Sequence, residues 1–260
     1  MIKRVISALV LVPIVVYAVV WADFFYVKLL VILIGALAYT EWMSLSYSLF
    51  NFTKLFYLSC FLFFSVFFLF YPEYSMDALF FCFVAHMVVN FASLEEGSFL
   101  NNQFYFSGLL YSSLYLFAVP FMRLYSGRLL LLVLFVSIWA GDSFAFFCGK
   151  AFGRRKLAPV ISPKKTVEGA VCGVVFGVVL GGVFGHLLGL DVRDVLIVSF
   201  VSNISGILGD LAESVPKRFF GKKDSSNLIP GHGGVLDRLD SFAFAVFFSY
   251  LVLLWTNSLF

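Results

Sequence analysis

The sequence predicts an all-α, polytopic integral membrane protein with about nine transmembrane helices. Two observations carry this prediction. Of the 260 residues, 62% are hydrophobic and only 13% are charged, and apolar runs long enough to cross a bilayer recur along most of the chain. A helix needs about 20 mainly apolar residues to span the hydrocarbon core of a membrane. This composition excludes an ordinary soluble domain.

The first span is expected at 5–22, after two basic residues, Lys3 and Arg4. It runs to Trp21 without a small-residue cleavage site, so we interpret it as a retained span and not as a signal peptide. The remaining spans are expected at 26–43, 55–71, 77–93, 104–122, 129–149, 167–189, 193–211 and 242–257.

The spans are expected to form a single membrane domain, 1–260, with two unequal parts. Residues 1–128 carry few charges and should supply packing, lipid contact or the interface of a homodimer. Residues 129–260 hold nearly all the polar clusters and should form the catalytic half. No nucleic-acid partner is expected.

The span at 167–189 carries a glycine at every fourth position, a spacing that puts these residues on one stripe of a helix. The six glycines are Gly169, Gly173, Gly177, Gly181, Gly185 and Gly189. Such a stripe lets another helix backbone approach closely, which is the favoured interpretation; a groove for an acyl chain is the alternative. In either case we expect this helix at the centre of the fold.

The four cysteines lie singly in apolar stretches, without a CxxC pair. They are Cys60, Cys82, Cys148 and Cys172. Their spacing implies neither a disulfide framework nor a zinc site, so we expect inert thiols within the spans.

Two polar connections, 150–165 and 217–238, are much more basic than the others. If the amino terminus is cytoplasmic, the side that holds it and both basic connections carries 14 of the 18 Lys and Arg residues. This asymmetry matches the positive-inside rule. We therefore expect the amino terminus and both connections in the cytoplasm. The membrane itself is expected to be the cytoplasmic membrane of a bacterium.

The segment 214–240, SVPKRFFGKKDSSNLIPGHGGVLDRLD, concentrates charge beside a glycine-rich turn. Its basic residues could neutralise phosphates, and the glycines around His232 let backbone N–H groups approach a ligand. Acidic pairs three residues apart, Asp210 with Glu213 and Asp237 with Asp240, share helix faces and could converge on a divalent ion. Mg²⁺ needs only one or two carboxylates, and without a Cys/His cluster zinc is disfavoured.

Two further segments combine charge with apolar surroundings. Asp142 lies deep in the run IWAGDSFAFFCGK, where an ionisable residue is a functional candidate; the alternative is a carboxylate paired with a lysine or with helix backbone. In the segment 162–169, Lys164 and Lys165 stand before a helix start and could form an anion site, while Thr166 and Glu168 could cap that helix. Topology-setting charge would explain the two lysines but leaves the rest of the motif without a reason.

The chain combines basic residues that could bind several phosphates with carboxylates that could hold Mg²⁺, and both lie in a membrane protein. This combination indicates phosphoryl or nucleotidyl transfer to a lipid. The charges alone identify neither the nucleotide nor the lipid. The rivals are a secondary transporter, a CTP-using lipid kinase and an inactive membrane scaffold.

The segment 214–240 closely resembles the signature of the phosphatidate cytidylyltransferase (CDP-diacylglycerol synthase) family. The matching positions are Ser214, Lys217-Arg218, Lys223-Asp224, Pro230, His232-Gly233-Gly234, Asp237-Arg238 and Asp240. The segment 162–169 and the stretch from Asp142 to Gly153 also look like the family. Pro216 and Phe146 depart from the family pattern, which puts fine geometry in doubt rather than activity.

The resemblance implies that CTP and phosphatidate react to CDP-diacylglycerol and pyrophosphate at the cytoplasmic face, with Mg²⁺ as cofactor and room for a monovalent cation such as K⁺. It implies metal ligation by Asp210 and Asp237, and catalytic roles for Lys217, Arg218, Lys223, Asp224, His232, Arg238 and Asp240. Substrate binding would fall to Asp142, Lys164, Lys165, Glu168, Ser214, Gly233 and Gly234.

Overall fold

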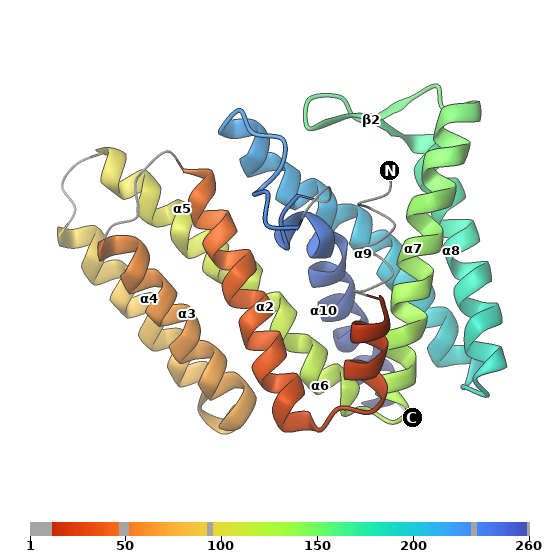
Figure 1. Ribbon diagram of the computed structural model, residues 1–260, viewed down its shortest axis with the longest axis horizontal. Coiled ribbons are helices and arrows are strands. Elements are labelled where there is room, and N and C mark those ends of the chain that lie inside the picture. Colours follow the sequence, from red (N-terminus) through yellow and green to blue (C-terminus); the bar gives the residue numbers. More distant parts are fainter. Residues whose placement is uncertain (1–11, 47–51, 93–95, 230–232, 259–260) are drawn as a thin grey trace.

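The computed structural model describes residues 12–46, 52–92, 96–229 and 233–258 of the chain. It is a helical bundle (Figure 1), and within these residues eight helical segments are long and apolar enough to cross a membrane. The prediction of an all-α polytopic membrane protein is therefore confirmed. The span expected at 5–22 lies partly outside the described residues; within them, 12–20 is helical.

The helices follow the expected order with shifted ends. A short helix, α6, and the 3-10 turns η1 (Pro72–Tyr74) and η2 (Leu114–Phe117) fall between or within the expected spans. The helices are α2 (Phe24–Leu45), α3 (Phe52–Phe70), α4 (Ser75–Ala92), α5 (Glu96–Ser113), α6 (Ala118–Met122), α7 (Gly127–Phe152), α8 (Val167–Leu187), α9 (Val192–Phe219) and α10 (Leu236–Ser258).

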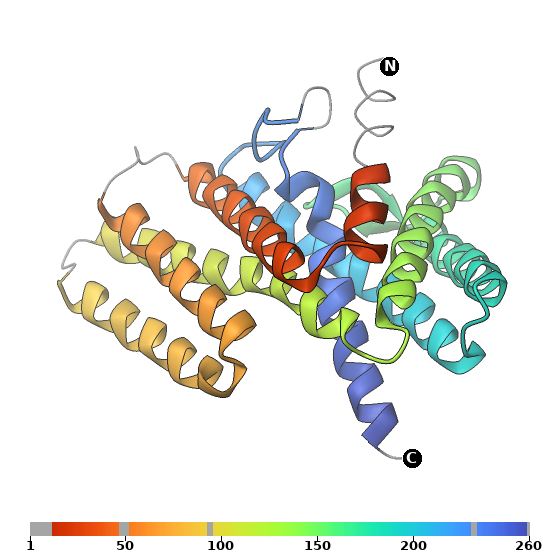
Figure 2. The ribbon, with the colours of Figure 1, turned by 60° about the horizontal axis from the view of Figure 1, so that its bottom comes forward.

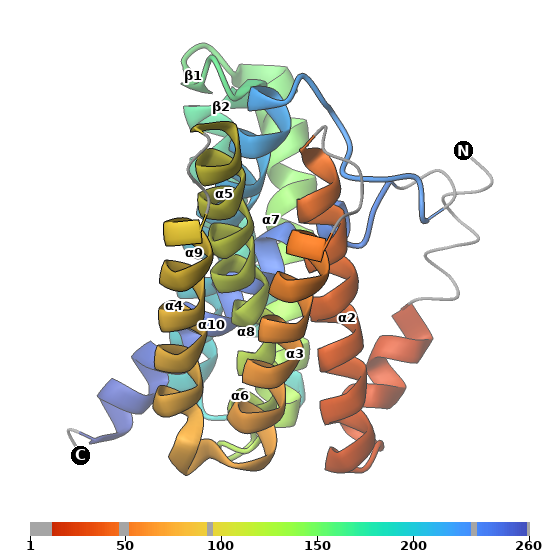
Figure 3. The ribbon, with the colours of Figure 1, turned by 90° about the vertical axis from the view of Figure 1, so that its left-hand side faces the viewer.

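The bundle has two flanks around a central group (Figures 1 and 2). Helices α3, α4 and α5 form one flank, α7 and α8 form the other, and α2, α9 and α10 lie between them. The most extensive helix contacts join α7 to α8 and α9 to α10. In Figures 1 and 3, the α7–α8 connection and the α9–α10 connection lie at the same end of the bundle. The topology therefore brings the two basic connections together.

The glycine stripe of α8 packs against its neighbours, which confirms the favoured interpretation. Gly169, Gly173, Gly177, Gly181 and Gly185 are all buried. A Cβ at Gly173 would lie 2.7 Å from the Gly141 carbonyl oxygen of α7, and one at Gly181 would lie 2.0 Å from Ser137 Oγ. Only hydrogen fits at these contacts.

Two expectations for this helix are wrong. Gly189 is not part of the stripe, because α8 ends at Leu187 and Gly189 follows with φ of +69°, a left-handed conformation that suits glycine after a helix end. The helix also lies at the edge of the bundle and not at its centre (Figure 1). Its stripe contacts α7 and α9, while Val171, Val175, Val179 and Val183 on other faces remain exposed.

Helices α9 and α10 reach further into the basic connection than expected. Helix α9 continues through Pro216 to Phe219, and α10 starts at Leu236 instead of residue 242. The signature acids Asp237 and Asp240 therefore stand in the first turns of a helix. This matters for the site because helix backbone fixes their directions.

The connection between α7 and α8 contains a small hairpin that the all-helical prediction did not include. Strands β1 (Lys156–Ala158) and β2 (Ser162–Thr166) pair antiparallel, with Lys156 opposite Thr166. Pro163 is an exposed residue of β2, which is compatible with a two-stranded edge.

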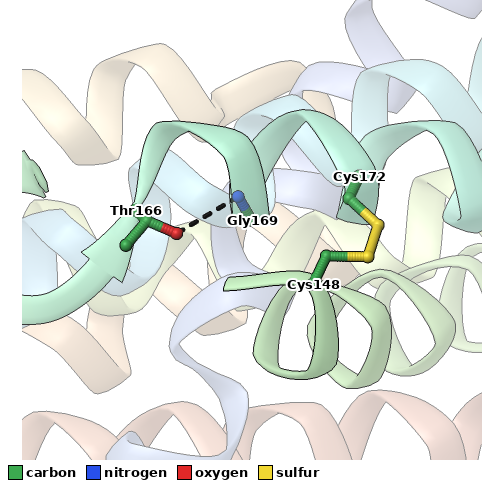
Figure 4. Close-up of a disulfide and its surroundings, with 4 residues drawn as sticks. All are labelled: Cys148, Thr166, Gly169 and Cys172. Atoms are coloured by element: carbon green, nitrogen blue, oxygen red, sulfur yellow. Dashed lines mark hydrogen bonds between the residues drawn. A yellow bond between two sulfur atoms is a disulfide. The ribbon is translucent and has the colours of Figure 1, made fainter. Parts of the chain in front are cut away.

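Two of the four cysteines form a disulfide, contrary to the expectation of inert thiols. Cys148 of α7 and Cys172 of α8 are joined, with their Cα atoms 6.3 Å apart (Figure 4). The close approach of the two helices at their glycines places the sulfur atoms face to face, and sequence spacing does not reveal this. Cys60 and Cys82 are free and buried, as expected.

Candidate active site

The hairpin and the α9–α10 connection contact each other directly. Lys165 of β2 forms an ion pair with Asp210 of α9 through Nζ and Oδ2. Arg218 Nε, near the end of α9, donates to the carbonyl oxygen of Ile161 in the hairpin turn at 3.1 Å. The fold thus joins two basic segments that are about 50 residues apart in the sequence.

A second ion-pair group joins α9 to α10. Lys217 Nζ lies 2.8 Å from Asp237 Oδ1 and also contacts Glu213 Oε2, one turn earlier on α9. The side chains of Lys217, Glu213 and Asp237 are 8%, 0% and 5% exposed. Glu213 Oε1 has no hydrogen-bond partner among the residues that the structure describes. A single buried ammonium group therefore holds two carboxylates.

The other oxygen of Asp237 organises the glycine turn. Asp237 Oδ2 accepts hydrogen bonds from Ser225 N at 2.8 Å, Ser225 Oγ at 3.0 Å and Gly234 N at 2.8 Å. Gly233 has φ of +84°, and a Cβ at Gly234 would lie 2.1 Å from Ser225 Oγ. The two glycines are required because the chain wraps tightly around this carboxylate.

The same turn is held from the opposite side by Glu41 of α2, a residue that sequence reasoning missed. Glu41 is 6% exposed, and its carboxylate accepts hydrogen bonds from Ser225, Ser226, Val235 and Leu236. An acidic residue inside an apolar span was a signal that could have identified it. The amino-terminal half therefore contributes to the site and does more than pack.

The remaining acids gather at the same place. Asp142 of α7 interacts electrostatically with Lys165, Asp210 and Arg238. Asp240 of α10 interacts with Asp210 and Lys217, and its carbonyl oxygen accepts a hydrogen bond of 3.2 Å from the Tyr111 hydroxyl of α5. The three segments that the sequence singled out are thus brought together.

A cavity of about 460 Å³ opens beside Asp142 between α7, the hairpin and α8. Its lining combines four lysines with apolar side chains, among them Phe146, the position that departs from the family pattern. The lysines are Lys150, Lys156, Lys164 and Lys165. A volume of this size is within the usual range for small-molecule sites.

Several predicted residues have structural partners. Glu168 accepts hydrogen bonds from the backbone N–H groups of Arg154 and Arg155 at 3.0–3.2 Å. Thr166 caps α8 by accepting from Gly169 N at 3.2 Å, as expected. Ser214 Oγ lies 3.4 Å from Asp210 Oδ1.

Three residues of the signature lie at the margin of this arrangement. Lys223 and Asp224 are exposed in the α9–α10 connection, and Arg238 is exposed on α10. His232 lies outside the described residues. Where the chain is described, no group of three or more His, Cys, Asp or Glu residues is arranged to hold a metal ion, so the two acidic pairs do not form a complete metal cage.

Comparison with known proteins decides the family. The model of the cytidylyltransferase family matches residues 2–256, nearly the whole chain. The chain belongs to the cytidylyltransferase family. The site described above therefore belongs to a member of the cytidylyltransferase family. It comprises the glycine turn, the ion pairs of Lys217 and Lys165 and the lysine-lined cavity.

Curated relatives carry the name phosphatidate cytidylyltransferase. The protein of Haemophilus influenzae is 48% identical over 133 residues, which cover 48% of this chain and 46% of the relative. The protein of Bacillus subtilis is 44% identical over 120 residues, 45% of each chain. That of Staphylococcus saprophyticus is 35% identical over 178 residues, covering 66% of this chain and 65% of the relative. The first two matches span about half the length of those relatives.

Proposed function

We propose that the chain is a phosphatidate cytidylyltransferase, which transfers CMP from CTP to phosphatidate and releases pyrophosphate. The observation that carries the proposal is the meeting of the hairpin and the α9–α10 turn, where Lys165 pairs with Asp210 and Lys217 with Asp237. Family membership and the names of the relatives support it.

The lysine-lined cavity is the proposed site of the phosphate groups. The four lysines around about 460 Å³ would offset part of the negative charge of a triphosphate and of a lipid phosphate. Phe146, Leu157 and Ile207 form an apolar part of the lining, which suits the glycerol end of a lipid or a nucleoside. The exposed apolar side chains of α7 and α8 beside the cavity would face the bilayer, so the acyl chains would remain in lipid.

Asp210 and Asp237 are the residues proposed to hold Mg²⁺, and their oxygen donors fit a hard cation. Asp210 is 28% exposed and Lys165 occupies its Oδ2, so an ammonium group already stands where a cation would be held. Within the described part of the chain, Asp237 Oδ1 accepts a hydrogen bond from Lys217 Nζ, and the second lone pair of this oxygen would be available to a cation. A monovalent cation such as K⁺ would compete for the same oxygens. When bound, Mg²⁺ would neutralise phosphate charge.

The reaction needs positioning more than proton transfer. A phosphate oxygen of phosphatidate would form a bond to the α-phosphorus of CTP, and the bond from that phosphorus to the oxygen bridging to the β-phosphorus would break, so that pyrophosphate leaves with the electron pair. The phosphate monoester is already anionic and needs no strong base. Lys164 and Lys165 would stabilise the charge that develops on the departing pyrophosphate.

The site is proposed to face the cytoplasm in a bacterial inner membrane. The support is that both basic connections lie at one end of the bundle, in agreement with the positive-inside rule. The homodimer expected from the sequence stays a prediction.

Pyrophosphate release by the purified protein tests the proposal. The protein in detergent is incubated with CTP, phosphatidate and Mg²⁺, and each component is omitted in turn. Release that requires all three supports the proposal. Formation of CDP with a phosphorylated lipid alcohol would identify a lipid kinase instead, and solute uptake into vesicles without any pyrophosphate would identify a transporter.

A further inference from the structure

We propose that Glu41 is a positioning residue of the active site: it fixes the two described ends of the α9–α10 turn, 225–226 and 234–236, and thereby the carboxylate of Asp237. The kinetic part of this inference rests on the proposed function, whereas the structural part does not. Glu41 belongs to α2, in the half of the chain that carries none of the family signature.

Four donors from two separate stretches converge on the Glu41 carboxylate. Oε1 accepts from Ser226 Oγ at 2.6 Å and from Val235 N at 3.0 Å. Oε2 accepts from Leu236 N at 2.8 Å and from Ser225 Oγ at 3.1 Å. The Ser225 hydroxyl has a single hydrogen, which it shares between Glu41 and Asp237, whereas Ser226 Oγ, Val235 N and Leu236 N donate to Glu41. The Glu41 carboxylate ties both ends of the turn to one point of α2.

The negative charge suits this position for a physical reason. Val235 N and Leu236 N lie at the start of α10, where backbone N–H groups lack partners within the helix and the helix dipole is positive. Hydrogen bonds from such donors to a carboxylate are stronger than bonds between neutral groups. An amide at residue 41 would replace one acceptor oxygen with an NH₂ group, which would face donors.

The link from Glu41 to the site is short. Ser225 Oγ lies 3.1 Å from Glu41 Oε2 and 3.0 Å from Asp237 Oδ2, so one hydroxyl stands between the two carboxylates. Gly234 fills the same gap, because a Cβ there would lie 2.4 Å from Glu41 Oε2. A displacement of Glu41 would therefore move the groups that orient Asp237.

A second contact joins the end of α2 to the first part of the α9–α10 connection. Lys222 Nζ donates to the carbonyl oxygen of Ser44, one turn after Glu41, at 2.6 Å. The last turn of α2 thus holds the connection both before and after its exposed segment 223–224. This explains how a helix without signature residues contributes to the geometry of the site.

Hydrogen exchange in detergent, followed by mass spectrometry, tests the structural part. The variants are Glu41→Gln and Glu41→Asp, and Tyr39→Phe is the matched control. Tyr39 lies half a turn away on α2, is fully buried, and loses only a hydrogen bond to the Tyr105 carbonyl oxygen. In Glu41→Gln we expect exchange over 225–237 to rise by about tenfold or more, with helices α3–α5 unchanged, because charge-assisted bonds are lost locally. Glu41→Asp keeps the charge and should show a smaller rise.

Kinetics of pyrophosphate release give the second measurement. Glu41→Gln should lower kcat by about 100-fold with a smaller change in the KM for CTP, because a small displacement of reacting groups mainly affects the chemical step. Tyr39→Phe should leave both constants near those of the unaltered protein.

The outcomes separate the two proposals. Exchange over 225–237 that is unchanged in Glu41→Gln, or raised equally by Tyr39→Phe, overturns the role of Glu41. If Glu41→Gln does not fold, hydrogen exchange of Glu41→Asp decides instead. A rise over 225–237 that Tyr39→Phe does not show supports the role of Glu41, and exchange equal to that of the unaltered protein overturns it. An unaltered protein that releases no pyrophosphate refutes the proposed function, while the exchange result still decides whether Glu41 fixes the turn.

Discussion

Lys217 of α9 and Asp237 of α10 form an ion pair of 2.8 Å between Nζ and Oδ1, and both side chains are almost buried. Glu213, fully buried, shares the same ammonium group. The resemblance implied a catalytic role for Lys217, but in this arrangement the residue first compensates two acids that would otherwise be buried without a counter-ion. The pair also fixes α10 against α9 at the point where the signature ends.

Replacement of Lys217 should therefore affect stability as well as activity. Lys217→Ala leaves two buried carboxylates uncompensated, and breaking a buried pair costs about 3–5 kcal/mol. We expect a clear fall in the thermal unfolding temperature in detergent. Lys223→Ala, an exposed lysine of the same connection, serves as control. Equal unfolding temperatures for the two variants would contradict the role of Lys217 as a buried counter-ion.

Gly234→Ala should abolish most activity, because its Cβ would lie 2.1 Å from Ser225 Oγ and 2.4 Å from Glu41 Oε2. The turn around Asp237 would have to open, and displaced reacting groups lose about 100-fold in rate. Gly182→Ala is the control, since the nearest atom to its Cβ is 3.8 Å away. Pyrophosphate release is the measurement, and normal turnover by Gly234→Ala would show that the turn tolerates expansion.

Two adjacent glycines of α8 offer a test of the packing stripe. A Cβ at Gly181 would lie 2.0 Å from Ser137 Oγ and 2.4 Å from Ser199 Oγ, whereas one at Gly182 would make only an ordinary van der Waals contact of 3.8 Å with Leu196. We expect Gly181→Ala to lower the free energy of unfolding by about 1–3 kcal/mol, the usual cost of overpacking. Gly182→Ala should be neutral or slightly stabilising, because alanine favours helix. Thermal unfolding of both variants checks the difference, and the reverse order would refute the stripe.

Asp210→Asn should weaken the response to Mg²⁺ if the proposed function holds. Removing a residue that only hydrogen-bonds to a metal ligand lowers metal affinity by about 10–100-fold. Removing a ligand itself should therefore raise the Mg²⁺ concentration needed for half-maximal activity by more than about tenfold. Asp194→Asn, at the opposite end of α9, is the control. An unchanged Mg²⁺ titration of pyrophosphate release would remove Asp210 from the metal site.

The disulfide predicts a specific pattern of thiol labelling. When the protein is denatured without reductant, alkylation should modify Cys60 and Cys82 only; after reduction it should modify all four cysteines. Mass spectrometry of the intact chain distinguishes two added groups from four. Four groups without reductant would show that Cys148 and Cys172 are adjacent thiols and are not bonded.

Much of the fold was predictable from local patterns. The apolar runs located the helices because a bilayer requires continuous hydrogen-bonded, apolar segments, and the four-residue glycine period identified the packing stripe of α8. The charged residues that the sequence singled out form ion pairs, Lys165 with Asp210 and Lys217 with Asp237, while their roles in a reaction stay a prediction. These features depend on residues near one another in the chain, or on a long and specific motif.

Other features were decided only by the tertiary structure. Glu41 meets Ser225 across 184 positions, and Cys148 meets Cys172 because two helices turn the right faces together. The position of α8 at the edge of the bundle, and the buried pairing of Lys217, likewise depend on which helices become neighbours. Sequence periodicity predicts which residues share a face of one helix. It does not predict which helix that face will contact, because that depends on how the whole chain packs.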